Sequence, residues 1–504
     1  MAEIKNTWGK RALAGFGVLA LASAGLLGGS TAASAATELG NIDQDAKGSI
    51  NIHKHKHQNG TDKVQNPDGS SPALGSPLDG VEFTAFPITN VNLKTSEGWG
   101  KLQDVTLGSA CELPADLTKG AEVAKVVTGS AGTAGQAKIS ELPVGAYLLC
   151  ETAAPPEVVD RALPFIVTIP LPHNNGWLYD VNVYPKNGTA GIEKTITPEH
   201  GLTLGSVVEF PVKTDVPSVR ADSSLTKYVI SDTLDARLGS VGVTSVTLDG
   251  ADVNVDYYDV LPADGVGNKR EVVFNAAGLA WLKTQPEKQI VTTFQGTVIE
   301  IGDGAITNKA TVFVNTPENE NELVSKPVTT NWGDVKILKI DDSEAAKGLQ
   351  GAEFQVYEAA DPYATTCAAT PAGDALNVNA EKIVTSGADG TIKIAGLFVS
   401  DSVNDPGRDS AFRCYVVKEI KAPAGFVTPT GDAAFTAVKV VKGQTAEGEY
   451  DGDPIVNKQQ EVPELPLTGA NGQMVMVIGG SALLLIAGGV VMLNRRRSAN
   501  EQQN

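Results

Sequence analysis

Three sets of one lysine, one acidic residue and one asparagine have the residue types needed for a reaction among side chains. Side chains in a β-strand alternate between its two faces, so residues two apart share a face. In each set, this alternation aligns the polar residues with apolar neighbours, which predicts that they point into a core. The sets are Lys54, Glu151 and Asn187; Lys194, Asp232 and Asn308; and Lys339, Glu419 and Asn457.

Burial would change the chemistry of these groups. Taking a charge out of water is costly, so a buried lysine tends to lose its proton and a buried carboxyl group to keep one. A neutral amine is a nucleophile, and a protonated carboxyl group can polarise an amide carbonyl and carry protons. Lys339 attacking the side-chain amide of Asn457, assisted by Glu419, would release ammonia and leave an internal isopeptide bond. An ordinary buried salt bridge, or a lysine on an edge strand, is the alternative for any single set.

The first set leaves its lysine open. Lys54 shares a face with Ile50 and Ile52, but Lys56 continues on the same face. Asn187 falls in step with the inward residues of the segment before it. Either lysine is therefore a candidate partner for this asparagine.

A different kind of chemistry is indicated near the C-terminus. The stretch LPLTG comprises Leu465, Pro466, Leu467, Thr468 and Gly469. It precedes an apolar run at 474–493, long enough for the ~20 residues that a helix needs to cross a hydrocarbon core. Three arginines follow at 495–497, and basic residues stay on the cytoplasmic side of a membrane. One interpretation of the run is a permanent single-pass anchor.

Residues 1–35 have the pattern of an export signal. Basic residues precede an apolar stretch at 12–27, and Ala33, Ser34 and Ala35 form a small-residue cleavage site. The remaining body has room for about three domains of ~100–200 residues each. The full chain carries a formal net charge of −19, which disfavours nucleic acid as a partner because phosphate would be repelled.

The four cysteines of this exported chain favour disulfides. Three pairings are open, and the most economical joins Cys111 to Cys150 and Cys367 to Cys414, because each pair then falls within one predicted domain. No two cysteines have the C-x-x-C spacing typical of metal sites. We expect no metal and no cofactor.

The elements that must position these residues are predicted to be strands. The body is rich in Val, Thr, Ile and Gly, with short alternating runs separated by turn residues. This pattern predicts an all-β fold of sandwich domains. The segment 275–285 is the best candidate for a short helix.

An internal repeat divides the body. LDGVEFTAF from Leu78 is similar to LQGAEFQVY from Leu349, and AYLLCETAAP from Ala146 is similar to CYVVKEIKAP from Cys414. The first and last domains are therefore predicted to be copies of one fold. We predict a signal peptide at 1–35, domains at 36–187, 188–331 and 332–458, and a sorting tail at 459–504.

These phrases carry a resemblance to a known family. LQGAEFQVYE and YVVKEIKAPAGF resemble the CnaB-type immunoglobulin-like domain of Gram-positive surface proteins, and the second phrase matches the pilin E-box. WLYDVNVYPKN, at 177–187, resembles the pilin motif, whose lysine is the linkage point of covalent pili. LPLTG resembles the sorting signal in which a sortase cysteine attacks the Thr–Gly bond. The whole chain resembles an actinobacterial fimbrial shaft subunit with three tandem CnaB-type domains.

The resemblance implies roles for particular residues. Lys339, Glu419 and Asn457 would take the three roles of a CnaB cross-link. Lys186, predicted to face away from the core, would be joined to Thr468 of another copy, giving a head-to-tail polymer. The implied partners are a pilus-specific sortase, peptidoglycan, a tip adhesin and a host receptor. The C-terminal apolar run would hold the chain at the membrane only until cleavage, leaving a wall-anchored surface fimbria.

Two other functions compete with the shaft subunit. A monomeric wall-anchored adhesin would share the export signal and LPLTG but would have no use for Lys186. An enzyme is less favoured, because the sequence has no Gly-rich phosphate loop and no plausible Ser/His/Asp set. His53, His55 and His57 share an outward face and could bind zinc, although exposed histidines on a strand are more often solvated. We therefore predict a structural protein without catalytic activity on external substrates.

Overall fold

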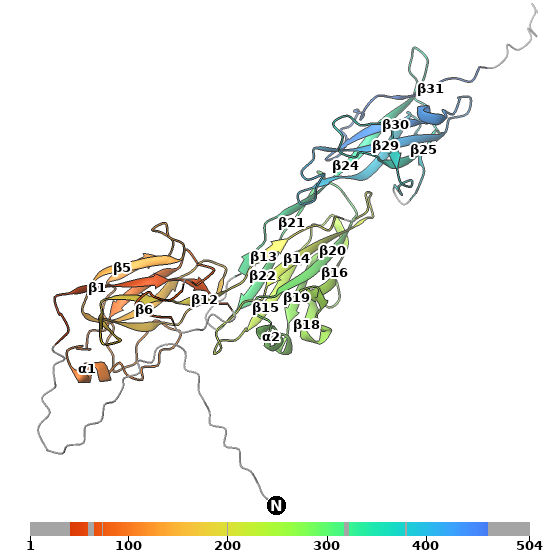
Figure 1. The fold of residues 1–504 in the computed structure, drawn as a ribbon. Helices are drawn as coiled ribbons and strands as arrows, with labels where there is room; N and C mark the ends of the chain where they lie inside the picture. Colours follow the sequence, from red (N-terminus) through yellow and green to blue (C-terminus); the bar gives the residue numbers. More distant parts are fainter. Residues whose placement is uncertain are drawn as a thin grey trace, which may run out of the picture.

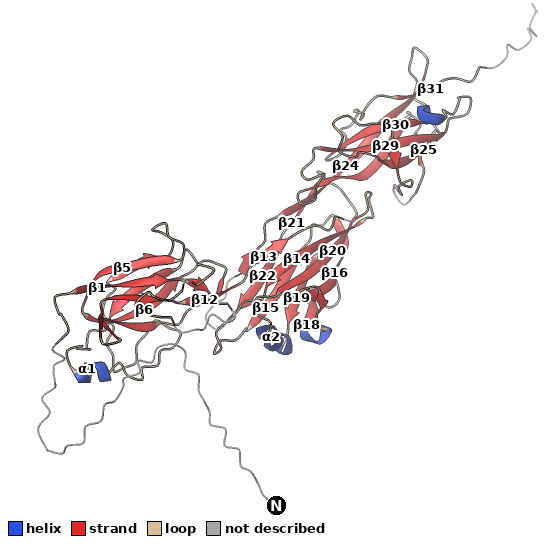
Figure 2. Ribbon diagram, in the orientation of Figure 1, coloured by secondary structure: helices blue, strands red, loops and turns tan. Residues whose placement is uncertain are grey.

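The computed structural model describes residues 41–58, 65–72, 74–198, 200–316, 322–378 and 381–461. The chain forms β-sheets with few and short helices (Figure 2). The sheets gather into three bodies that follow one another end to end in chain order (Figure 1). Each body has a separate large apolar core.

The first body is built around two facing sheets. Its core takes side chains such as Ile50, Phe83 and Leu149 from both of them. One sheet has the order β11 (Asp180–Val183), β1 (Lys47–His53), β5 (Gln136–Pro143), and the other β4 (Ala124–Val127), β3 (Glu82–Pro87), β6 (Gly145–Ala153), β8 (Phe165–Ile169). Two smaller sheets complete the first body. One has the order β2 (His55–Lys56), β12 (Lys186–Thr189), β7 (Val158–Asp160), and the other pairs β9 (Leu171–His173) with β10 (Gly176–Leu178). A short helix, α1, spans Ser96–Gly100.

The middle body is a sandwich of two five-stranded sheets. Its strands show the alternation expected of sheets with one face on a core, since every second residue of β14 and β20 is buried. The first sheet has the order β13 (Ile192–Lys194), β14 (Val207–Asp215), β20 (Gln289–Val298), β16 (Leu238–Leu248), β17 (Ala251–Asp252). The second has the order β18 (Tyr258–Leu261), β19 (Lys269–Phe274), β15 (Lys227–Thr233), β22 (Ala310–Asn315), β23 (Glu322–Val324).

The predicted helix lies in the middle body as α2 (Ala276–Lys283), close to the single-turn helix η1 (Val255–Tyr257). The side chain of Asn275 caps α2 by accepting hydrogen bonds from the main-chain N–H groups of Ala277 and Gly278. Asparagine is a favoured N-cap because it satisfies donors that have no partner within the helix.

The third body shares its first strand with the joint to the middle body. β24 (Val328–Asp341) runs through position 331 without a break, pairing first with β21 (Ala305–Asn308) and then with β28 (Thr391–Asp401) and β31 (Ile455–Asn457). The facing sheet contains β26 (Pro371–Ala372), β25 (Glu353–Ala359), β29 (Phe412–Lys421), β30 (Phe435–Val441) and β27 (Val384–Thr385), followed along the chain from β29 by η2 (Gly431–Ala434).

The strand register matches the predicted repeat of the first and third bodies. Phe83 of β3 lies opposite Glu151 of β6, and Phe354 of β25 lies opposite Glu419 of β29. In both pairs the register shifts just before the phenylalanine. The repeated phrases therefore place an acidic residue at the same point of two similar sheets.

Both predicted disulfides are confirmed. Cys111 and Cys150 are bonded across 39 residues, and Cys367 and Cys414 across 47 residues. Each pair ties a loop to a central strand, β6 in the first body and β29 in the third.

Candidate cross-linking sites

The third body brings Lys339, Glu419 and Asn457 together in its interior. Lys339 is 0% exposed, Glu419 3% and Asn457 2%. The Lys339 Nζ donates to Asn457 Oδ1 at 2.5 Å, and Asn457 Nδ2 donates to Glu419 Oε1 at 2.6 Å. The Nζ also lies 3.5 Å from Glu419 Oε2 and donates to the main-chain oxygen of Ile455 at 3.1 Å. An amine, a carboxamide and a carboxyl group thus lie in contact with one another, out of reach of solvent.

The middle body brings its three residues together with a different set of contacts. Lys194 Nζ donates to Asp232 Oδ2, and Asn308 Nδ2 donates to the same oxygen at 3.2 Å. The rings of Phe210 and Phe294 have their centres 5.0 and 5.8 Å from the Nζ. Within the described part of the chain, Asp232 Oδ1 and Asn308 Oδ1 are buried without a hydrogen-bond partner. A proton on the carboxyl group would supply a donor that these two acceptors lack.

The first body repeats the arrangement of the third. Lys54 Nζ donates to Asn187 Oδ1 at 2.5 Å and to Glu151 Oε2 at 2.8 Å. Asn187 Nδ2 donates to Glu151 Oε1 at 2.6 Å. The main-chain N–H of Ala162 adds a donor to Asn187 Oδ1 at 2.8 Å. Lys54 and Asn187 are both 0% exposed, so the site is closed to solvent from the amine side.

Burial shifts the pKa values of the three lysines, and of the acidic residues in the middle and third bodies, toward their neutral forms. It lowers the pKa of Lys54 to about 8, against the attraction of Glu151. It also lowers the pKa of Lys194 and of Lys339 below the ordinary lysine value, against the attraction of their acidic neighbours. Loss of water raises the pKa values of Asp232 and Glu419, with the nearby lysines opposing. The middle and third sites therefore favour a neutral amine beside a protonated carboxyl group.

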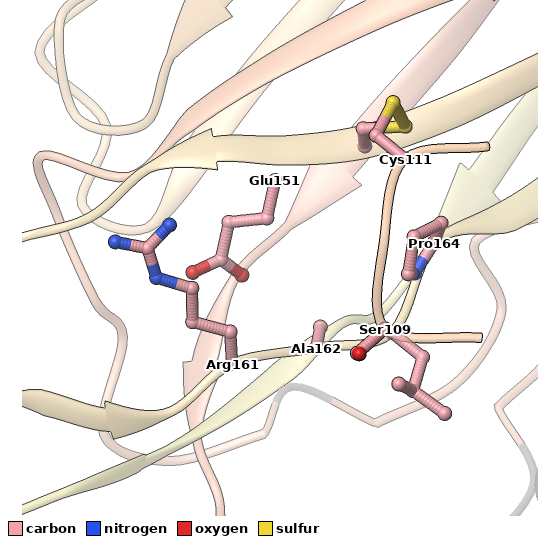
Figure 3. A pocket seen from close by; sticks show the side chains of 8 residues that line it. Ser109, Cys111, Glu151, Arg161, Ala162 and Pro164 are labelled. Atoms are coloured by element: carbon pink, nitrogen blue, oxygen red, sulfur yellow. A yellow bond between two sulfur atoms is a disulfide. The ribbon is translucent and has the colours of Figure 1, made fainter. Parts of the chain in front are cut away.

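A small pocket reaches the carboxyl group of the first site. It has a volume of about 110 Å³ and is lined by Glu151, Arg161, Ser109 and the Cys111–Cys150 disulfide, among others (Figure 3). A buried water needs roughly 10–15 Å³, so a molecule the size of water or ammonia fits. The disulfide holds the 109–111 loop as one wall of this space.

The pilin-motif lysine lies at the end of the first body. Lys186 begins β12, where it lies opposite His55 of β2 in a parallel pair. Its side chain is partly exposed, while the next residue, Asn187, is fully buried. Adjacent residues of this short strand thus point to opposite faces, as strand geometry requires.

Two details differ from the alternation in the sequence. Lys56 is exposed, so Lys54 is the lysine of the first site. β1 ends at His53 and β2 begins at His55, and this break ends the alternation that put both lysines on one face. Leu178 is an even number of positions from Lys186, so alternation would place it on the same outward face, but it packs against the core because β10 and β11 are separate strands.

The three histidines considered for zinc binding each have their own protein partner. His53 Nε2 lies 2.9 Å from Asn182 Oδ1, and His55 Nδ1 lies 2.9 Å from the main-chain oxygen of Gly75. His57 Nδ1 lies 2.8 Å from Ser218 Oγ of the middle body. Within the described residues, no group of three or more His, Cys, Asp or Glu side chains is placed to hold a metal ion.

The predicted sorting signal, including Thr468, lies outside the described residues, as do the residues of the predicted export signal. In the described ranges, no helix is long and apolar enough to cross a membrane. The apolar run at 474–493 also falls outside those ranges.

Some contacts of the first site have no signal in the sequence. The Ala162 donor is a main-chain N–H, which any residue but proline would supply. Asp160 is 1% exposed and paired with Arg220 of the middle body, with Arg220 Nη1 2.9 Å from Asp160 Oδ1. The two residues are 60 positions apart, and strand periodicity does not connect them.

The chain matches three described families. Residues 45–188 match the N-terminal D1 domain of Gram-positive pilin subunits, 333–450 match a prealbumin-like fold domain, and 457–500 match the LPXTG cell wall anchor motif.

Similar proteins cover nearly the whole chain. It is 40% identical to fimbrial subunit type 2 of Actinomyces naeslundii over 94% of this chain and 93% of the relative. It is 29% identical to fimbrial subunit type 1 of Actinomyces viscosus over 93% of this chain and 94% of the relative. The full-length major pilin SpaD of Corynebacterium diphtheriae superposes with a TM-score of 0.66 at 29% identity, covering 84% of this chain and 99% of SpaD. The chain therefore belongs to the sortase-assembled major pilins of Gram-positive bacteria and is a cell-wall-anchored fimbrial shaft subunit.

Proposed function

We propose that copies of this chain are joined by an amide bond between Thr468 of one subunit and Lys186 of the next. A pilus-specific sortase cleaves the Thr468–Gly469 peptide bond, and its cysteine forms a thioester with the carbonyl carbon of Thr468. The Lys186 amine attacks that carbon, the thiolate leaves, and the amine loses a proton. The contact is heterologous and does not close into a ring, so repetition gives a filament.

The processing steps follow from the two ends of the sequence. Export removes residues 1–35, and the apolar run at 474–493 holds the chain as a transient membrane intermediate until the sortase acts. The last subunit is joined to peptidoglycan instead of to another pilin. A separate tip adhesin completes the filament, and contact with a host receptor is its proposed role.

Internal isopeptide bonds strengthen each subunit. In each site the neutral lysine Nζ attacks the asparagine Cγ, a C–N bond forms, and the amide nitrogen leaves as ammonia. The acidic residue, Glu151, Asp232 or Glu419, polarises the amide carbonyl and carries the proton from the amine to the leaving group. We propose domains at 36–187, 188–331 and 332–458, so that each contains one bond. The three main cores support three units, and the middle core also takes Val159, Trp332 and Phe398 from its neighbours.

The observation that supports the proposed internal bonds is the repeated burial of a lysine amine against an asparagine amide and a carboxyl group. Intact-mass measurement of the mature chain tests it, since the mass should fall short by one ammonia per bond. A mature chain with the full unreacted mass would refute the cross-links.

The linkage between subunits has its own test. Lys186→Ala should abolish the ladder of covalent polymers on a denaturing gel of wall extracts, while the monomer still folds and reaches the wall. Lys56→Ala is the matched control, because Lys56 is an exposed lysine on the neighbouring strand β2. A ladder that persists in Lys186→Ala, or that disappears in Lys56→Ala, would contradict the assignment.

A further inference from the structure

The first and middle bodies share one strand. Neighbouring residues of β7 point into different cores, with Val158 in that of the first body and Val159 in that of the middle body. Thr316 of the middle body donates its hydroxyl to the main-chain oxygen of Val159 at 2.7 Å. The position of β7 therefore depends on both bodies.

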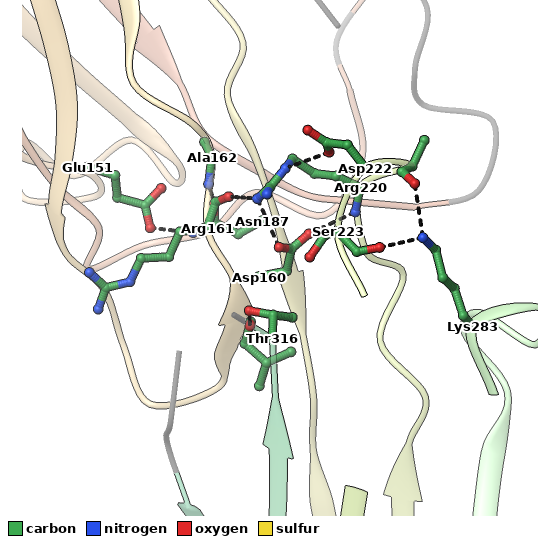
Figure 4. Close-up of polar contacts among 12 residues, drawn as sticks. Glu151, Asp160, Arg161, Ala162, Asn187, Arg220, Asp222, Ser223, Lys283 and Thr316 are labelled. Carbon is green, nitrogen blue, oxygen red and sulfur yellow. Dashed lines mark hydrogen bonds and ion pairs between the residues drawn. The ribbon is translucent and has the colours of Figure 1, made fainter. Parts of the chain in front are cut away.

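Arg220 of the middle body forms hydrogen bonds with Asp160, the last residue of this strand (Figure 4). Its main-chain N–H donates to Asp160 Oδ2 at 2.8 Å, and its Nη1 donates to Asp160 Oδ1 at 2.9 Å. The same Nη1 donates to the main-chain oxygen of Arg161. The Asp160 side chain is 0% exposed and that of Arg220 17% exposed, so this charged pair is largely shielded from water. Such a charge-assisted, two-point contact fixes the position of the Asp160 carboxylate relative to Arg220.

The segment held by Arg220 leads directly into the first cross-linking site. The N–H of Ala162 donates to Asn187 Oδ1 at 2.8 Å, and Figure 4 shows the Asp160–Ala162 segment between Arg220 and Asn187. When the Lys54 amine attacks Cγ of Asn187, negative charge develops on this Oδ1. A fixed N–H aimed at a developing oxyanion stabilises the transition state.

The other two sites have no equivalent main-chain donor in the described part of the chain. The amide oxygen of Asn457 accepts from Lys339 Nζ, and that of Asn308 has no partner. The first site therefore differs from the other two. Its amide oxygen accepts a hydrogen bond from a main-chain segment whose position is fixed by Arg220 of the middle body.

We propose that Arg220 is a positioning residue for the Lys54–Asn187 bond, so that the first domain cross-links efficiently only after the middle domain has docked against it. The inference rests on the proposed internal bond. In the reaction the Lys54 nitrogen bonds to Asn187 Cγ, the C–N bond of the amide breaks, and ammonia leaves with a proton carried by Glu151. The bond consequently forms in a first domain that already makes its native contacts with the middle domain.

The test follows bond formation in the full exported chain. After a pulse of expression, samples are denatured at intervals, and the peptide linking Lys54 to Asn187 is quantified by mass spectrometry. In Arg220→Met, which keeps an unbranched side chain and the main-chain bond to Asp160 but loses the hydrogen bonds of the guanidinium group, this bond should form at least about tenfold more slowly. Arg220→Lys, which can still reach Asp160, should restore part of the rate.

Internal markers separate slow chemistry from failure to fold. The Cys111–Cys150 disulfide reports folding of the first domain, and the Lys194–Asn308 bond reports folding of the middle one. Asp222→Asn is the matched control, because Asp222 contacts Arg220 Nε at 3.2 Å from an exposed position and should leave the rate unchanged. If Arg220→Met does not fold, Thr316→Val decides, since it removes the hydroxyl that holds Val159 and should slow the same bond.

The outcomes are distinguishable. A wild-type rate in folded Arg220→Met, or in Thr316→Val where that variant decides, overturns the role of the joint but leaves the internal bond intact. Equal slowing of the Lys339–Asn457 bond also overturns it, because that site is far from the joint. Absence of the Lys54–Asn187 peptide in the wild-type chain overturns both the proposed bond and the inference.

Discussion

Lys339 and Asn457 are 118 residues apart in sequence, yet their side chains meet at 2.5 Å. They lie on β24 and β31, which are parallel neighbours at the start and end of the third domain. A bond between them closes almost the whole domain into one covalent loop. A pull on the two ends of the domain would then be carried by the cross-link and not by the hydrogen bonds of the sheets.

Removing the carboxyl group should prevent this bond. In Glu419→Ala, no group remains to carry the proton from Lys339 to the leaving amide, so the variant should keep the ammonia that the wild-type chain loses. Peptide mapping by mass spectrometry should find Asn457 unmodified. Glu353→Ala is the control, because Glu353 forms an ion pair with Lys421 outside the core; a normal bond is expected there. A complete bond in Glu419→Ala would remove the acid from the mechanism.

The middle domain allows the cross-link to be separated from the buried ion pair. Asn308→Ala leaves Lys194 bonded to Asp232 but removes the amide that would react. If the cross-link exists, the free energy of unfolding should fall by about 2–4 kcal/mol, by analogy with a disulfide that closes a loop of similar size. Chemical denaturation monitored by tryptophan fluorescence measures the change.

The control for that variant is Thr307→Ala, an exposed neighbour on β21 that bonds only to Thr329 among the described contacts. It should change stability by less than about 0.5 kcal/mol. Equal stabilities for Asn308→Ala and the wild-type chain would leave the ion pair as the sole role of this site.

The lowered pKa of Lys54 predicts a pH dependence in a chain that cannot cross-link. Lys54 has a pKa of about 8 in the folded chain, against 10.5 for the ordinary side chain, and in Asn187→Ala it should stay buried and keep a lowered pKa. Between these values the unfolded chain binds more protons than the folded one, so stability should rise with pH from about 8 to about 10. Calorimetry at both ends of this window should show a higher melting temperature at the upper end.

The increase should disappear in Lys54→Met/Asn187→Ala, which has no amine to titrate at this position. A melting temperature of Asn187→Ala that falls over the window, or a rise that persists in the double variant, would show that another group governs the pH dependence.

Strand parity explains why so much of these sites could be predicted. Lys194, Asp232 and Asn308 each fall in step with buried apolar residues, and the alternation of the strands carries them into the core. Parity failed where a strand broke. Lys56 follows the break at Lys54, and Leu178 precedes the break at Tyr179.

The contacts between bodies could not be predicted from periodicity. The pairing of Asp160 with Arg220 depends on how two separately folded sandwiches meet, and local alternation contains no information about that meeting. The Ala162 donor belongs to the main chain and therefore leaves no trace in residue type. The continuity of strand β24 could not be predicted either. Its pairing partner changes near Asn331, and register shifts around Trp332 and Gly333 move the buried positions from even to odd residue numbers.

The joint between the middle and third domains should depend on the absence of a side chain at Gly333. A Cβ at this position of β24 would lie 1.9 Å from the main-chain oxygen of Val441, so Gly333→Ala must displace one of the two strands. Overpacking of this kind costs about 1–3 kcal/mol, and here the displaced atoms are backbone next to the buried Trp332. Both neighbouring cross-links should still form, because Asn308 and Lys339 lie away from the clash, but the angle between the domains should vary more.

Small-angle X-ray scattering should then show a broader distribution of end-to-end lengths than for Gly242→Ala, whose Cβ would make only ordinary contacts with Gln295 at 3.6 Å. Identical scattering from the two variants would mean that the third domain is held by its other contacts, such as the packing of Trp332 against Phe398.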